Sequence, residues 1–434
     1  MHLALGDENG GVGVSYEAFL NSKKKKWRDG GVVANASGYD LFPFQKAVVE
    51  WACKKGRAAI FAGTGLGKTR MQVTYADLMG GNALILCPVA VARQTIEEAA
   101  SIGVEVVRDV KSRITITNYE QLHNVDWTPD VVILDESSIL KSHDGKTRRF
   151  IQDRFAATPY KLCLTATPAP NDYMELGTTS EFLGVASRLE MLAEYFTHDG
   201  GDTSKWRLKG HAKKDFWQWV ASWALAFTSP DDLGFDGSAY KLPPLEVHSH
   251  EVGDPDLIGG LFGGTIDVNA TNVHKHNRDS MHERADLAVS LASGDKPCVI
   301  WCTGNDEQAY IAGRVDCVSV MGSDSPMSKE AKLDAFAKGA ARVLVTKPSI
   351  CGFGLNWQHC DRMVFASFDY SFEKTYQAIR RCYRFGQKNP VHVHLIHDAI
   401  TASVLSSVTA KQMAFDSMHR EMRKYTGDTL CLNS

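Results

Sequence analysis

The stretch Ala58-Ala59-Ile60-Phe61-Ala62-Gly63-Thr64-Gly65-Leu66-Gly67-Lys68-Thr69 decides the fold, because it joins a short apolar strand to a glycine-rich turn. We expect the helix that follows to run from about Lys68 to Met79 and to end at Gly80-Gly81. A strand, a glycine-rich loop and a helix in this order are the context that a P-loop requires. The stretch therefore predicts a phosphate-binding turn, although Ala62 stands where the strict pattern has glycine.

Each residue type in this turn has a physical role in holding a phosphate group. The glycines let backbone N–H groups approach phosphate oxygens, and the start of the helix adds a favourable dipole. We expect Lys68 to neutralise the β- and γ-phosphates and the Thr69 hydroxyl to bind Mg²⁺. The predicted nucleotide-binding residues of the turn are Gly63, Thr64, Gly65, Leu66, Gly67, Lys68 and Thr69.

A second apolar strand, Val131–Leu134, ends in two carboxylates, Asp135 and Glu136. We expect Asp135 to hold hydrated Mg²⁺, and Glu136 to orient and deprotonate an attacking water. An Asp-Glu pair after a strand is weak evidence alone, but behind a P-loop it is strong. The sequence thus predicts ATP and Mg²⁺ as ligands.

Short apolar strands alternate with amphipathic helices along most of the chain, which predicts an α/β fold with parallel sheets. The rhythm occurs twice, so we expect two lobes. The first set of predicted strands is Ala58–Phe61, Ala83–Cys87, Ile114–Thr117, Val131–Leu134 and Lys161–Leu164. The second set is Cys298–Trp301, Cys317–Val320, Arg342–Val345, Met363–Ala366 and Val391–Ile396.

The composition fits two globular domains and excludes several protein classes. The chain has 434 residues, 44% of them apolar, and a formal net charge of only −3, so any nucleic-acid site must be a local groove. Its ten cysteines form no C-x-x-C pair, which indicates reduced thiols in a cytoplasmic protein. No run reaches the roughly 18 apolar residues of a membrane span, and the N-terminus lacks the order of a signal peptide. The basic run Lys23–Lys26 beside Trp27 is either a solvated tail or a contact to a phosphate backbone.

The segment between the two lobes is rich in aromatic residues. Phe216, Trp219, Val220, Trp223 and Phe227 follow helical spacing, which favours one helix with an aromatic stripe in the core over a base-stacking surface. Ser229–Gly234 is predicted to be a turn, and Leu242-Pro243-Pro244-Leu245 a stiff connector into the second lobe.

Two histidine groups invite a metal interpretation. Alternation along Val391–His397 places His392 and His394 on one strand face, as two metal ligands would lie. Because no cysteine or carboxylate joins them at a convincing local spacing, we interpret the strand as one with a polar face. The same interpretation applies to His248, His250, His274 and His276.

The stretch Gln377–Gln387 contains Gln377, Arg381 and Arg384 at spacings that place all three on one face of a helix. Planar guanidinium groups bind phosphate oxygens in bidentate fashion, so this face is suited to a triphosphate across a cleft. We therefore predict Lys68, Asp135, Glu136, Gln377, Arg381 and Arg384 as the catalytic set.

Together these elements resemble superfamily 2 helicases, specifically the Swi/Snf-like branch, and compact helicases encoded by phages and prophages. The resemblance covers about residues 40 to 400, and the Arg384-Phe385-Gly386-Gln387 ending favours this branch over the RNA-directed one. It implies RecA-like lobes. It also implies roles for further residues: Phe44, Gln45 and Gly354 for the nucleotide; Thr165, Thr167 and Ser138 for coupling; Pro88, Thr117, Asn118, Tyr119, Gly322 and Asn356 for the nucleic acid.

The sequence departs from the family pattern at two motifs. Asp135-Glu136-Ser137-Ser138 replaces the commoner Asp-Glu-x-His, so we expect Ser138 to hydrogen-bond to Thr165 or Gln377. Phe353 interrupts the glycine-rich motif around Gly354.

The resemblance implies an ATP-dependent DNA helicase or double-stranded DNA translocase that acts on double-stranded or branched DNA, with accessory replication or recombination proteins as further partners. An RNA helicase and a nucleotide-switched binding module without strand separation stay open. A membrane is not an expected partner, and the expected location is the cytoplasm, that of the bacterial host if a phage encodes the chain. The expected domains are a loose segment (1–30), lobe one (31–180), a helical insertion with a linker (181–245), lobe two (246–425) and a tail (426–434).

Overall fold

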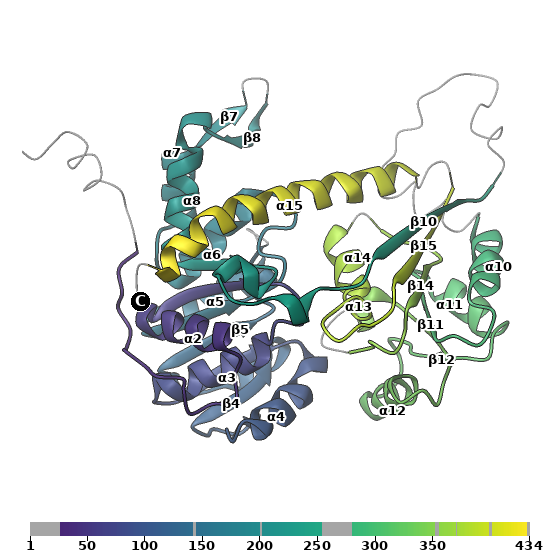
Figure 1. The fold of residues 1–434 in the computed structure, drawn as a ribbon, viewed down its shortest axis with the longest axis horizontal. Helices are drawn as coiled ribbons and strands as arrows, with labels where there is room; N and C mark the ends of the chain where they lie inside the picture. The colour runs from purple at the N-terminus through teal and green to yellow at the C-terminus, as the bar shows by residue number, and fades with distance from the viewer. Residues whose placement is uncertain are drawn as a thin grey trace, which may run out of the picture.

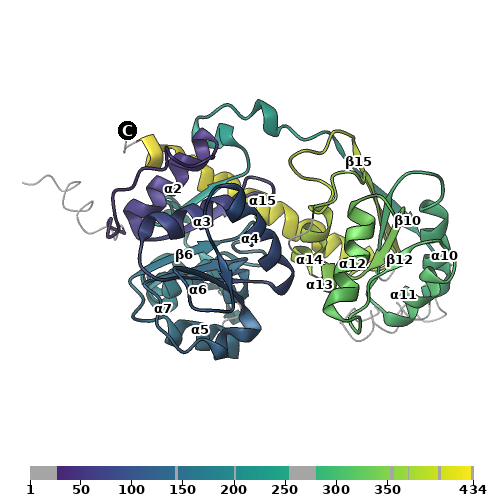
Figure 2. The same cartoon turned by 90° about the horizontal axis from the view of Figure 1, so that it is seen from below.

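The computed structural model describes residues 27–141, 145–199, 202–253, 280–351, 356–369, 371–398 and 402–431. It has two α/β lobes side by side, with one long helix lying across both (Figures 1 and 2). None of the described helices is long and apolar enough to cross a membrane.

Lobe one is built on a seven-stranded sheet in the order β3-β4-β2-β5-β6-β1-β9, and all its neighbouring strands are parallel. The five strands predicted for this lobe are present, and two more, β3 and β9, lie at the edges. The strands are β1 (Arg57–Ala62), β2 (Ala83–Cys87), β3 (Val107–Arg108), β4 (Ile114–Asn118), β5 (Val131–Asp135), β6 (Tyr160–Leu164) and β9 (Ala224–Phe227).

Alternate residues of each strand face opposite helical layers. Ala58 and Ile60 of β1 pack in the core under the first helices, whereas Ala59 and Phe61 belong to the core on the other side. The first layer contains α2 (Pro43–Lys55), α3 (Lys68–Met79) and α4 (Ala92–Ser101). The second contains α5 (Lys146–Arg154), α6 (Leu176–Leu183), α7 (Arg188–Tyr195) and α8 (Lys213–Ala221).

Lobe two has a six-stranded parallel sheet in the order β10-β15-β14-β11-β13-β12. It contains the five strands predicted for this lobe, with β10 added at one edge. The strands are β10 (Leu245–Glu251), β11 (Cys298–Trp301), β12 (Val318–Ser319), β13 (Val343–Thr346), β14 (Arg362–Phe365) and β15 (Val391–His397). The helices are α10 (Met281–Leu291), α11 (Asn305–Ala312), α12 (Pro326–Ala337), α13 (Pro348–Cys351), α14 (Phe372–Ile379) and α15 (Ala402–Cys431).

The segment 181–245 differs from the expected helical insertion. Besides α7 and α8 it contains an antiparallel hairpin, β7 (Phe196–Asp199) and β8 (Asp202–Leu208), and the edge strand β9. The prediction of one aromatic helix was therefore wrong, since α8 ends at Ala221. The reason is that the sheet edge offers other hydrogen bonds: Ala59 N–H donates to Trp223 O, and Gly63 N–H donates to Phe227 O.

The aromatic stripe is nevertheless buried, as predicted. Phe216, Trp217 and Trp223 are fully buried beneath the sheet of lobe one, so these rings have no surface on which a base could stack. The predicted turn is also present, as a 3-10 turn over Pro230–Leu233 that Ser229 caps. The eight cysteines whose side chains the structure describes are free thiols, as expected.

Helix α15 leaves lobe two after β15 and returns to lobe one, where its last part lies over α8 and β9 (Figure 1). We expected the chain beyond 425 to be a tail, but α15 continues to Cys431. Phe415, Met418 and Met422 on this helix are buried in a core cluster that contains residues of both lobes. Arg423 adds a salt bridge to Asp232 at 2.9 Å. The helix therefore joins the lobes by apolar packing as well as by the chain itself.

Candidate active site

A cleft of about 430 Å³ is lined by residues of both lobes. Lobe one contributes the P-loop and the end of β5, and lobe two contributes the segment that follows α14. Tyr240 reaches it from a 3-10 turn, Ser238–Tyr240, that lies between β9 and the connector. The lining residues that the sequence also singled out as site residues are Gln45, Thr64, Gly65, Gly67, Lys68, Thr69, Asp135, Glu136, Arg381 and Arg384.

The P-loop joins β1 to α3, as predicted, with α3 running from Lys68 to Met79. Gly65 and Gly67 have φ angles of +86° and +80°, which L side chains rarely adopt, so glycine is required at these two positions. The Lys68 ammonium donates to the carbonyl oxygens of Ala62 (2.9 Å) and Gly63 (3.3 Å), both within its own loop. Burial lowers the pKa of Lys68, with Arg384 and Arg381 adding to this effect while Glu136 and Asp135 oppose it.

The two carboxylates at the end of β5 are held by different partners. Asp135 is buried, and one of its oxygens accepts a hydrogen bond from Gln72 on α3 at 3.1 Å. Burial, and after it the charge of Glu136, raises the pKa of Asp135. Glu136 lines the cleft, and its backbone has a φ of +55°, an uncommon angle for a non-glycine residue. A cation beside Asp135 would favour the ionised form of its carboxylate.

The two arginines enter from lobe two by different routes. Arg381 is 2% exposed, and its guanidinium donates to the backbone oxygen (3.0 Å) and the side-chain oxygen (3.2 Å) of Gln377. Arg384 donates to the side-chain oxygen of Asn356, and burial lowers its pKa to about 10, so it stays protonated at neutral pH. Gln377 itself does not line the cleft but lies behind Arg381, and its side-chain nitrogen has no described hydrogen-bond partner.

Hydrogen bonds connect the cleft to the helix that precedes the two arginines. The Thr165 hydroxyl donates to Glu136 at 3.4 Å, and its oxygen accepts the Thr167 backbone N–H at 3.0 Å. The Thr167 hydroxyl then donates to Glu373 on α14, across the lobes, at 3.2 Å. Lys141 of lobe one forms an ion pair with the same Glu373. The structure thus brings the two predicted coupling threonines together, and it adds Glu373, which sequence reasoning missed.

Ser138 does not make the contacts predicted for it. It is buried, but none of the described hydrogen bonds joins it to Thr165 or Gln377. The Thr165 hydroxyl is directed to Glu136 instead, and the Gln377 side-chain oxygen is taken by Arg381. The expectation that Ser138 replaces the missing histidine is therefore wrong.

Three aromatic rings border the cleft, and none was predicted as a site residue. Tyr240 stacks on Phe385 with ring centroids 4.4 Å apart, and Phe42 meets Tyr240 edge-on at 5.9 Å. The predicted aromatic residue, Phe44, is instead 2% exposed and packs in the core against Phe227, so that prediction was wrong. Helical direction explains the error, since Phe44 lies on the core-facing side of α2 and Phe42 precedes the helix.

Gln45 holds the P-loop by a hydrogen bond to its backbone. Its side-chain nitrogen donates to Leu66 O at 3.0 Å, and its oxygen accepts the Phe42 N–H at 3.0 Å. A Cβ atom added to Gly67 would lie 2.2 Å from the Gln45 nitrogen, so the loop and this side chain are in close contact. Gly63 and Leu66 belong to the P-loop, but neither of them lines the cleft. Gly354 and Phe353 lie outside the described residues.

The predicted nucleic-acid residues divide into two groups. Thr117, Asn118 and Tyr119 are buried: Thr117 donates to Asp109, Asn118 caps the next turn, and the Tyr119 hydroxyl donates to Asp135 O. Their side chains therefore face the interior rather than a ligand, which corrects the prediction. Pro88 is partly exposed, and Gly322 and Asn356 are exposed. The Lys23–Lys26 run lies outside the described residues.

Comparisons with known proteins agree with this architecture. Residues 284–386 match the family model of the helicase conserved C-terminal domain. A putative protein p41 of Acyrthosiphon pisum secondary endosymbiont phage 1 is 21% identical, over 88% of this chain and 98% of its own.

Two solved structures are similar to this chain over most of their length. Dbp5 of S. cerevisiae, bound to RNA and ADP BeF3, has a TM-score of 0.52 and 12% identity, over 89% of this chain and 98% of its own. The Sulfolobus solfataricus SWI2/SNF2 ATPase core in complex with dsDNA has a TM-score of 0.43 and 16% identity, over 91% and 96%. The chain therefore folds as two RecA-like lobes, and residues 284–386 of the second lobe match the helicase conserved C-terminal domain.

Proposed function

We propose that this chain is an ATP-hydrolysing motor on DNA, a DNA helicase or double-stranded DNA translocase of the Swi/Snf-like branch. The observation that carries the proposal is the cleft in which Lys68, Asp135 and Glu136 of lobe one meet Arg381 and Arg384 of lobe two. Cations and carboxylates arranged around one cleft suit a triphosphate with its metal ion.

The residues present fit ATP and Mg²⁺. The cleft volume of about 430 Å³ lies in the range of small-molecule sites. The Thr64 hydroxyl is buried in the P-loop without a described hydrogen-bond partner, as expected of a group that meets a ligand. Lys68 would hold the phosphates, and Thr69 and Asp135 would hold Mg²⁺, which neutralises charge on the transferred phosphoryl group.

The chain's own residues account for the remaining steps. Glu136 would orient the attacking water and take its proton, while Arg381 and Arg384 stabilise the charge that develops on the γ-phosphate. Since these groups come from separate lobes, hydrolysis requires that the lobes stay closed. The bonds from Glu136 through Thr165 and Thr167 to Glu373 would transmit the state of the site to α14.

DNA is the proposed partner because the Arg384-Phe385-Gly386-Gln387 ending resembles the Swi/Snf-like branch. Phe385 is part of the interlobe contact, since a Cβ atom on Gly65 would lie 2.9 Å from Phe385 Cβ. Pro88, Gly322 and Asn356 are the proposed contacts to a nucleic-acid backbone, which implies little sequence specificity. Accessory replication or recombination proteins and the cytoplasm of a bacterial host belong to the same proposal, which the similarity to a phage protein supports.

The decisive test is ATP turnover by the full chain with matched DNA and RNA duplexes, with Lys68→Ala as the background control. We expect the DNA duplex to stimulate turnover and the RNA duplex to have little effect. Stimulation by RNA alone would replace the proposal with an RNA helicase, and no stimulation by either would contradict a motor. Forked-duplex and triplex displacement assays then separate strand separation from translocation on a duplex.

A further inference from the structure

One face of the β10–β15 edge of lobe two gathers four histidines and a carboxylate. The strands are parallel, with Glu246 opposite His392 and His248 opposite His394. Because alternate residues of a strand share a face, these four side chains and His250 lie on the same side of the sheet. The sequence alone did not predict that Glu246 lies beside the histidines, because strand pairing joins positions that are far apart in the chain.

Three of these side chains place their ligand atoms close together. The His392 Nδ1 atom lies 3.2 Å from Glu246 Oε2 and 3.2 Å from His248 Nε2. The remaining separation, from His248 Nε2 to Glu246 Oε2, is 3.9 Å. Zinc bonds of about 2.0–2.1 Å in tetrahedral geometry separate neighbouring ligand atoms by about 3.3–3.4 Å. The triangle therefore needs only small side-chain rotations to hold such an ion.

The three side chains cannot all satisfy one another by hydrogen bonds. When His392 is neutral, its Nδ1 atom carries at most one proton, yet two acceptor-capable atoms lie within 3.2 Å of it. One of these atoms therefore faces a lone pair or shares the proton. A divalent ion between the three atoms would accept an electron pair from each.

We propose that Glu246, His248 and His392 form a binding site for a borderline divalent transition ion, with Zn²⁺ as the expected occupant. Two imidazoles and one carboxylate are a ligand set that Zn²⁺ takes in proteins. Side-chain exposures of 47%, 40% and 36% for Glu246, His248 and His392 leave the site open to solvent, so a water would complete the tetrahedron.

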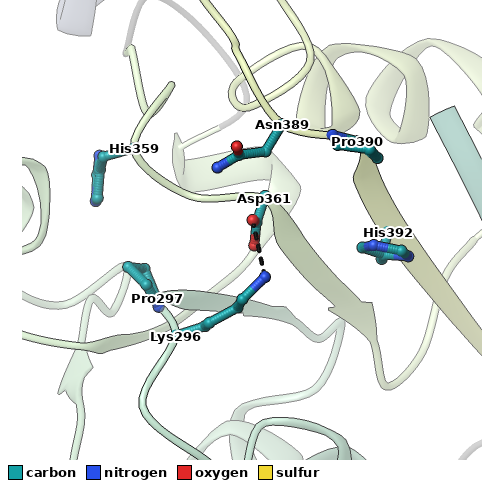
Figure 3. Close-up of a pocket in the computed structure, with 7 residues that line it drawn as sticks. All are labelled: Lys296, Pro297, His359, Asp361, Asn389, Pro390 and His392. Atoms are coloured by element: carbon teal, nitrogen blue, oxygen red, sulfur yellow. Dashed lines mark hydrogen bonds and ion pairs between the residues drawn. The ribbon is translucent and has the colours of Figure 1, made fainter. Parts of the chain in front are cut away.

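The proposed site lies on the two strands that connect lobe two to the rest of the chain. Strand β10 receives the connector from lobe one, and β15 leads to α15, which returns to lobe one. An ion bound across β10 and β15 would tie together the two strands through which the chain enters and leaves lobe two. His392 also lines a pocket of about 290 Å³ together with the Lys296–Asp361 ion pair (Figure 3).

The test uses the untagged full chain, stripped of metal with a chelator. Titration with Zn²⁺ should show saturable binding of one ion and a rise in Tm, since ligand binding to the folded state stabilises it. Titration with Co²⁺ should give the intense visible bands of a tetrahedral ion without a thiolate charge-transfer band. We expect His392→Ala and Glu246→Gln to weaken Zn²⁺ binding by about 100-fold or more, since even outer contacts are worth about 10–100-fold.

Matched variants make the result specific. His250→Ala removes an imidazole from the same strand face outside the triangle, and His211→Ala removes an exposed imidazole of lobe one. Both should bind Zn²⁺ as the unmodified chain does, and circular dichroism of each metal-free variant checks its fold. The proposal is overturned by unchanged affinity in His392→Ala, by equal losses in His250→Ala, or by a thiolate band. It is also overturned if Asp135→Asn removes the binding, which would place the ion in the cleft.

Discussion

The two halves of the cleft are held in place in different ways. In lobe one, Lys68 comes after β1 and Asp135 ends β5, two parallel strands on either side of β6, and Gln72 of α3 connects the P-loop helix to Asp135 at 3.1 Å. In lobe two, Gln377 holds Arg381 and Asn356 holds Arg384, while the bond from Thr167 to Glu373 fixes α14, which precedes both arginines, against lobe one. Each half is thus held within its own lobe, but the distance of the arginines from the P-loop depends on how the lobes meet.

The largest effect is expected from removing a lobe-one group. Lys68→Ala removes the cation proposed to hold the phosphates, and Glu136→Gln removes the proposed base. We expect both to abolish stimulated ATP turnover, with Lys68→Ala also weakening ATP binding and Glu136→Gln leaving it intact. Phosphate release and fluorescent-nucleotide titration measure the two quantities. Turnover at the unmodified rate in either variant would refute the assignment of the site.

A smaller effect is expected from the contact that joins the halves. Glu373→Gln removes the buried charge that pairs with Lys141 and weakens the bond from Thr167. Hydrogen bonds to charged groups are worth about 1.5–3 kcal/mol, so stimulated turnover should fall about 10- to 100-fold if the contact forms only on closure.

The matched control is Glu330→Gln, which breaks the exposed cross-lobe pair between α12 and Arg93 of α4. Exposed pairs contribute little, so its turnover should stay near that of the unmodified chain. Equal losses in Glu373→Gln and Glu330→Gln would show that any interlobe charge matters, and would remove the special role of Glu373. ATP affinity measured in parallel should change little in both variants.

The smallest effect concerns the packing of α15 on lobe one and its dependence on pH. Burial, and after it the charge of Arg423, lowers the pKa of His419 from 6.5 to about 4. The folded state therefore favours the neutral ring, and stability is present above pH 6.5 and is lost as the pH falls toward 4. The shift corresponds to at most about 3 kcal/mol.

Thermal unfolding of the full chain between pH 7 and pH 4.5 measures this loss. His419→Leu places an apolar side chain that does not titrate in the buried position. The variant should therefore show a weaker dependence of Tm on pH in this range. A variant whose Tm falls as steeply as that of the unmodified chain would assign the pH dependence to other groups.

Much of lobe one could be predicted because its signals are local. The strand before Gly63, the helix from Lys68 to Met79 and the carboxylates after Val131–Leu134 are each read within one short segment. The spacing of Arg381 and Arg384 indicated a phosphate-facing surface, and both line the cleft. The predicted helix face was wrong, however, because α14 ends at Ile379 and both arginines lie in the turns that follow it.

The features that the sequence did not predict depend on contacts between segments that are distant in the chain. Strand β9 was hidden because its aromatic residues continue the helical spacing of α8, and only pairing with β1 shows its conformation. Tyr240 and Glu373 have no local signature, since each acts through a partner in another part of the chain. The return of α15 to lobe one is likewise a property of packing.

The central claim is that lobe two completes the ATP site of lobe one. It is tested most directly by the single-turnover rate of ATP hydrolysis in Arg384→Ala, measured at saturating ATP and DNA beside the affinity for ATP. The account predicts affinity within a few-fold of the unmodified chain and a fall in rate of about 10³-fold or more, as for an arginine finger. An undiminished rate would contradict it, because the site would then lie in lobe one alone.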